Sequence, residues 1–85
     1  MKLTRTAFEL ALRTTLREAE LARRAFAVVN SGELHARVGG YPGRSHAMPL
    51  CCSVMCDAMV QGDAVLAQPR KGNDAELTIK YALPR

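Results

Sequence analysis

The sequence has no tryptophan, only two phenylalanines and two tyrosines, and only three cysteines. Three cysteines, two of them adjacent at Cys51 and Cys52, cannot all pair with one another, so the pattern excludes a disulfide framework and predicts free thiols in a reducing compartment. No apolar run approaches the roughly 18 residues that a membrane-spanning helix needs. The first residues carry charges at Lys2, Arg5 and Glu9, where a signal peptide has its apolar core. We therefore expect a cytoplasmic protein without membrane contact.

Length and charge indicate the class of function. The 85 residues fit one domain over 1–85, and a domain this short has little room for an enclosed substrate pocket beside its core. With 48% hydrophobic and 24% charged residues, the chain has the composition of a folded protein. The net charge of +4 comes from residues 1–44, which hold eight basic and four acidic side chains, whereas residues 45–85 hold four of each. This balance favours a binding module with an anionic partner such as nucleic acid, without catalysis or a cofactor.

The first third of the chain predicts a long helix. From Thr4 to Val29 there is no glycine or proline, and alanine, leucine, arginine and glutamate dominate. The pattern fits one helix, or two helices with a joint near Thr14 and Thr15. Its apolar stripe, with spacings of three and four, consists of Phe8, Leu12, Leu16, Ala19, Ala22, Phe26 and Val29.

A second, partial apolar stripe beside the first consists of Leu3, Ala7, Leu10, Leu21, Ala25 and Val28. A helix that is apolar on two faces can serve both a core and a second copy of the chain. At 1.5 Å per residue it would also be about 39 Å long, which is more than the remaining chain readily covers. We therefore predict a homodimer through this helix, with residues 1–21 as a helical extension and dimerisation segment.

Two shorter helices follow. Asn30-Ser31-Gly32-Glu33 has the form of a capping box and predicts a helix over Ser31–Val38, which Gly39 and Gly40 end. After a turn at Tyr41-Pro42-Gly43, Met48-Pro49 predicts the start of a third helix, because proline is tolerated in a first helical turn. We expect it to run over Pro49–Val60. Its apolar side would include Cys51, and Cys52 and Cys56 would lie nearer the surface.

The C-terminal part predicts a β-hairpin. Ala64–Ala67 forms a short apolar run, and Glu76–Leu83 alternates apolar and polar residues. The segment between them is polar, contains Gly72 and carries Arg70 and Lys71, so the hairpin has a basic loop. The fold class that follows is α+β, with a long N-terminal helix, two further helices and a C-terminal hairpin.

From about Ala22 to the end, this order of elements resembles the winged helix-turn-helix family of DNA-binding domains. The resemblance is one of topology, over residues 22–85. It implies a winged-helix-like fold with Ser31–Val38 as second helix, Pro49–Val60 as recognition helix in the DNA major groove, and Arg70–Asp74 as the wing.

The resemblance also implies a set of DNA contacts. Arg44, His46 and Ser53 would lie near the groove of double-stranded DNA, and Arg70 and Lys71 would contact phosphates. The protein would then be a small transcriptional regulator. The third helix itself has Asp57 and no arginine or lysine, and its preceding turn, Gly39 to Met48, is longer than usual. The alternative is therefore a protein-interaction or assembly module, whose partner would bind Met55, Met59 and the wide helix surfaces.

Two chemical interpretations of the cysteines receive little support. Cys52 and Cys56 with His46 or His35 supply one pair of ligands at most, whereas a structural zinc site needs two pairs. Cys51 and Cys52 follow His46 near a helix start, but no residue can be assigned to orient that imidazole. We expect no metal site, and we expect His35 at the surface or half-buried.

Overall fold

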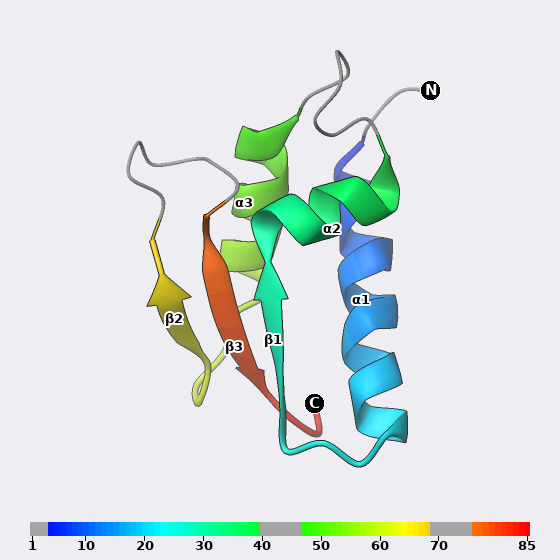
Figure 1. Cartoon of the computed structure of the whole chain (residues 1–85), viewed down its shortest axis with the longest axis vertical. Coiled ribbons are helices and arrows are strands. Elements are labelled where there is room, and N and C mark those ends of the chain that lie inside the picture. The colour runs from blue at the N-terminus through cyan, green and yellow to red at the C-terminus, as the bar shows by residue number, and fades with distance from the viewer. Residues whose placement is uncertain (1–3, 40–46, 69–75) are drawn as a thin grey trace.

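The computed structural model describes residues 4–39, 47–68 and 76–85. Within these ranges the element order is α1 (Arg5–Leu21), β1 (Phe26–Asn30), α2 (Ser31–Val38), α3 (Met48–Asp57), β2 (Ala64–Ala67) and β3 (Thr78–Ala82). The three strands form one antiparallel sheet in the order β1-β3-β2, and α3 lies behind it (Figure 1). The predicted α+β class, with a long N-terminal helix and strands at the C-terminal end, is confirmed.

Helix α1 is shorter than the sequence pattern predicted. The side chain of Thr4 caps it by accepting the N–H of Ala7, and its buried side is formed by Phe8, Leu12 and Leu16. The helix ends at Leu21 because the chain turns into the left-handed region at Arg23, where φ is 61°. The prediction of a helix to Val29 is therefore wrong.

Strand β1 occupies the last four residues of that predicted helix, 26–29, together with Asn30. Ala27 and Val29 are buried, whereas Phe26 and Val28 are exposed, which is the alternation of a strand with one covered face. The carbonyl oxygen of Ala25 accepts the N–H of Leu83, which joins the start of β1 to the end of β3. Apolar residues at 26, 28 and 29 fit both a helical stripe and a strand, and pairing with β3 selects the strand.

The predicted starts of α2 and α3 are confirmed. The Oδ1 atom of Asn30 accepts the N–H of Glu33 at 3.1 Å, as the capping box requires, and Gly39 follows α2 with φ of 119°. Helix α3 carries Pro49 in its first turn and ends at Asp57, three residues before the predicted end.

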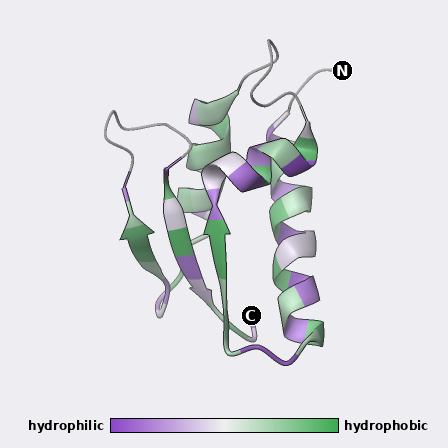
Figure 2. Ribbon diagram, viewed as in Figure 1, coloured by the Kyte–Doolittle hydropathy of each residue, from purple (hydrophilic) through white to green (hydrophobic). Residues whose placement is uncertain are grey.

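The sheet is built around β3. Ile79 and Tyr81 are fully buried on its inner face, and β1 pairs with it over five residues from Phe26↔Ala82 to Asn30↔Thr78. The predicted pairing of Ala64–Ala67 with the last strand is confirmed, with a bulge between Val65 and Ala67. The inner face packs on the three helices and forms one core. Apolar residues also run along most of β1 and β2 (Figure 2).

Among the described residues, no helix is long and apolar enough to cross a membrane.

Candidate functional site

Helix α3 is fastened at its N-terminal end by a buried histidine. Nε2 of His35 in α2 accepts the N–H of Ala47 at 2.8 Å, just before the first turn of α3. An imidazole that accepts at Nε2 is neutral and carries its proton on Nδ1. The ring meets Phe8 edge-on at 5.1 Å, and the residue is 0% exposed. The expectation that His35 lies at the surface or half-buried is wrong, because the ring fills the junction of α1, α2 and α3.

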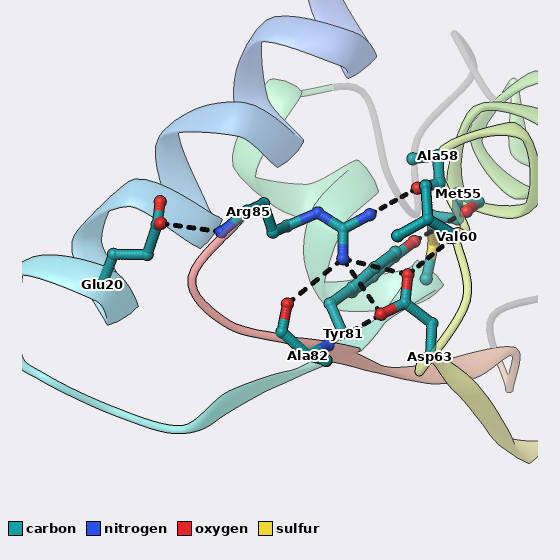
Figure 3. A network of polar contacts seen from close by, with 8 residues as sticks. All are labelled: Glu20, Met55, Ala58, Val60, Asp63, Tyr81, Ala82 and Arg85. Carbon is teal, nitrogen blue, oxygen red and sulfur yellow. Dashed lines mark hydrogen bonds and ion pairs between the residues drawn. The ribbon is translucent and has the colours of Figure 1, made fainter.

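The C-terminal end of α3 is held by the end of the sheet (Figure 3). The buried hydroxyl of Tyr81 donates to the carbonyl oxygen of Met55 at 2.7 Å. Nη2 of Arg85 donates to the carbonyl oxygen of Ala58 at 2.6 Å, and its Nη1 lies 3.0 Å from the carboxylate of Asp63. These contacts satisfy carbonyl oxygens of the last helical turn, which have no partner within the helix itself.

Asp63 completes this second anchor. Its side chain is 0% exposed, and it accepts the N–H groups of Val60 and Ala82. Burial acts to raise the pKa of this carboxyl, but the two backbone N–H donors and Arg85 outweigh it, so the pKa of Asp63 lies below its usual value. Asp63 therefore stays ionised and joins the loop before β2 to β3.

The outward face of α3 is joined to the first turn of α1. Ser53, Cys56 and Asp57 are exposed there. The guanidinium of Arg5 donates to Oγ of Ser53 at 3.4 Å and forms an ion pair with Asp57. The acidic group of Asp57 is thus neutralised, and the paired guanidinium of Arg5 lies beside Ser53, which the sequence marked for DNA contact.

Of the five predicted contact residues, Ser53 alone lies within the described ranges, at an exposed position on α3. Arg44, His46, Arg70 and Lys71 lie outside the described residues. Sequence reasoning missed Arg5, because only the packing of α1 on α3 brings its side chain to this face. Arg5 also pairs with Glu9 at 3.5 Å, but this i,i+4 spacing within α1 does not indicate a contact with α3.

A groove continues from this face along α1. Its volume is about 460 Å³, and Leu12, Leu16 and Val54 form its floor. Arg13 and Arg17 stand on its rim and make no hydrogen bond or ion pair within the described part of the chain. The lining also includes Glu9, Glu20 and Asp57, so the groove carries charges of both signs with two unpaired arginines on its rim.

The three cysteines divide between core and surface. Cys51 and Cys52 are buried, and Cys56 is exposed. The predictions for Cys51 and Cys56 are confirmed, but Cys52 is 2% exposed and not near the surface, because the buried side of α3 includes it. Burial, with the neighbouring Cys52, raises the pKa of the Cys51 thiol to about 12. That thiol is protonated at neutral pH and is not an activated nucleophile.

The described residues contain no group of three or more histidine, cysteine or acidic side chains that could hold a metal ion. Comparison with protein-family models, with curated proteins and with solved structures gave no match to this chain.

Proposed function

We propose that the chain is a winged helix-turn-helix module that binds double-stranded DNA with the outward face of α3, without catalysis. The observation that carries the proposal is the arrangement of its elements. In the sequence, β1 follows α1 and precedes α2. In the sheet, β1 pairs with the hairpin of β2 and β3 in the order β1-β3-β2, and α3 packs beside the sheet. This arrangement leaves one face of α3 open to a ligand.

The anchors at both ends of α3 support this role. A recognition helix must stay fixed within the protein while contacts with DNA phosphates set the position of the protein on the duplex. His35 holds the entrance of α3 from α2, and Tyr81 and Arg85 hold its exit from β3 and the chain end. The helix is thus fixed to three different elements and presents Ser53 on a rigid base.

Positive charge enters the proposal from outside α3, since α3 itself has no arginine or lysine. The N-terminal end of α3, the end of β2 and the start of β3 lie at the same end of the molecule (Figure 1). The cations that the proposal assigns to DNA contact lie outside the described residues and are Arg44, His46, Arg70 and Lys71. Arg5 pairs with Asp57 and with Glu9, so it balances acidic charge beside α3 and adds no free cation.

The test is the salt dependence of DNA binding. Fluorescence anisotropy with a labelled duplex of about 20 base pairs should show micromolar binding that weakens steeply with salt. The double variant Arg70→Ala/Lys71→Ala should reduce the slope of log K against log salt by about 2, since each lost phosphate contact removes about 0.9.

The matched control is Arg23→Ala/Arg24→Ala, which removes the same charge from the turn between α1 and β1 and should leave the slope nearly unchanged. Equal effects of the two double variants would show that net charge alone drives the binding. Absence of binding at low salt would favour the alternative, a protein-interaction or assembly module.

One observation favours that alternative. The exposed residues of α3 include Pro49 and Cys56 and no arginine or lysine, so its open face is weakly polar. Met55, which the alternative assigned to a partner, is 0% exposed and serves the core, whereas Met59 is half-buried. A partner protein would therefore bind Met59 and the first turn of α3 and not Met55.

The homodimer through α1 remains part of the proposal. Leu10 is 57% exposed and Leu21 is 73% exposed, which leaves two large apolar side chains on the outer side of the helix. Ala25 and Val28, also assigned to the dimer stripe, lie after the end of α1 and are not part of it. Sedimentation equilibrium should show a dimer that Leu10→Glu/Leu21→Glu converts to a monomer.

A further inference from the structure

The β1 edge of the sheet offers unpaired backbone groups. The carbonyl oxygen of Ala25 and the N–H of Ser31 both point to β3, because they bond to Leu83 and Leu77 there. Backbone groups in a strand alternate in direction with a period of two residues. The N–H and C=O groups of Phe26 therefore point away from β3, and those of Val28 do the same.

The two edges of the sheet differ in how they resist further pairing. Strand β2 has only four residues and a bulge between Val65 and Ala67, which are common ways to block an edge. Strand β1 pairs with β3 in unbroken register and contains no charge, proline or bulge in its sequence FAVVN. An unprotected regular edge is a template for an added strand.

A groove follows this open edge. It lies between β1 and the C-terminal half of α1 and has a volume of about 330 Å³. Ala19 and Ala22 line its helix side, and Ala27 and Val28 line its strand side. Short side chains on both sides leave room for the backbone of an extended segment next to β1. Figure 1 shows α1 running alongside this edge.

Two charged residues line the groove, Arg24 and Glu18. Arg24 has no acidic partner within the described part of the chain. Glu18 is already paired with Arg37 at 3.0 Å, which offsets its negative charge. An anionic side chain on an incoming segment would therefore be attracted by Arg24 and only weakly repelled by Glu18.

We propose that the β1–α1 groove binds an extended, acidic segment of a partner protein as a fourth strand of the sheet. Its backbone pairs with Phe26 and Val28, and alternate side chains enter the groove against Ala19 and Ala22. A carboxylate near the start of β1 meets Arg24. This site is separate from α3 and does not depend on DNA binding.

Selection from a random peptide library displayed on phage tests the proposal, with peptides of about eight residues, long enough to pair with the whole strand. The enriched peptides should alternate apolar and other residues and carry an acid at one end. Titration of the most enriched synthetic peptide should shift the amide NMR signals of Phe26 and Val28.

Two variants locate the site. Arg24→Glu should weaken the peptide about 5- to 10-fold, because an attraction becomes a repulsion. Ala22→Gln, at an exposed position, fills the groove and should weaken it about 10-fold or more. The matched control Arg17→Glu reverses one charge on the opposite groove of α1 and should leave the affinity within about 2-fold.

Other outcomes would overturn the proposal. These are enrichment of basic or acid-free peptides, binding that shifts α3 and not β1, or no enrichment at all. Amide NMR shifts of Phe26 and Val28 that appear when the protein alone is concentrated would assign the edge to a second copy of the chain. Shifts of the same signals on adding duplex DNA would assign the edge to DNA. Either result would reject the proposal.

Discussion

The two ends of α3 are held in different ways. At the N-terminal end, one buried imidazole accepts one backbone N–H, from Ala47. At the C-terminal end, Tyr81 and Arg85 donate to two carbonyl oxygens, and Asp63 ties Arg85 to the neighbouring loop. The N-terminal end thus depends on buried contacts with α2, which include the contact from Sγ of Cys51 to the carbonyl oxygen of Ser31 at 3.5 Å. The C-terminal end depends on a network that reaches the surface.

The difference bears on the proposed contact with DNA, which concerns the N-terminal end of α3. Helix N-termini present free N–H groups to anions, and no side chain caps α3 at Ala47. The carbonyl oxygens at the other end are occupied by the protein itself. A helix whose last carbonyl oxygens are occupied and whose N-terminal end has no side-chain cap suits the proposed contact with phosphates at the N-terminal end.

The largest effect is expected from removing the N-terminal anchor. His35→Leu leaves the N–H of Ala47 without its acceptor and changes the shape of a fully buried site, so it should lower the free energy of unfolding by about 3 kcal/mol. Urea denaturation measures this. The control Ala36→Gln, at an exposed position of the same helix, should change stability by less than about 0.5 kcal/mol.

Tyr81→Phe tests the C-terminal anchor with the smallest chemical change. It removes only the hydroxyl that donates to Met55, so the cost should be about 1.5 kcal/mol, with an unchanged denaturant slope. A cost equal to that of His35→Leu would remove the expected difference between the buried anchor at the N-terminal end and the network at the C-terminal end.

Acid should weaken the C-terminal anchor through Asp63. Because the pKa of Asp63 is lowered by folding, its stabilisation is complete above the unfolded pKa of about 3.9 and is lost as the pH falls through the lower folded pKa. Asp63→Asn should cost about 1 kcal/mol at neutral pH, from weaker hydrogen bonds. It should lose less stability than the wild type on acidification. Urea midpoints at neutral and acid pH check this, and parallel loss in both proteins would contradict it.

The smallest expected effect is a change in the rate of thiol labelling, which reports on the packing at both ends of α3. Iodoacetamide should modify Cys56 in the native protein and spare Cys51, which is buried and has its pKa raised to about 12. In His35→Leu, Cys51 should react faster, whereas in Tyr81→Phe its rate should change little. Mass spectrometry of digested protein measures both sites.

The sequence predicted features that depend on neighbouring residues. Asn30 and Glu33 form a capping box and Pro49 a helix start, because both signals act within one turn of the chain. The alternation in Glu76–Leu83 predicted β3, since period two is specific to a strand with one buried face.

Features that depend on residues far apart in the sequence could not be predicted from local patterns. Phe26–Asn30 fits a helical stripe as well as a strand, and only β3, about fifty residues later, decides between them. The burial of His35 depends on an acceptor role toward Ala47, and the place of Arg5 depends on how α1 crosses α3. Neither has a local signal.

The most direct test of DNA binding by α3 is an amide NMR titration with a duplex of about 20 base pairs at low salt. The account predicts shifts at Ser53, Cys56 and the first turn of α3 that disappear as salt is raised, with Phe26 and Val28 unaffected. No shift at low salt, or shifts confined to β1 and the C-terminal end of α1, would contradict it.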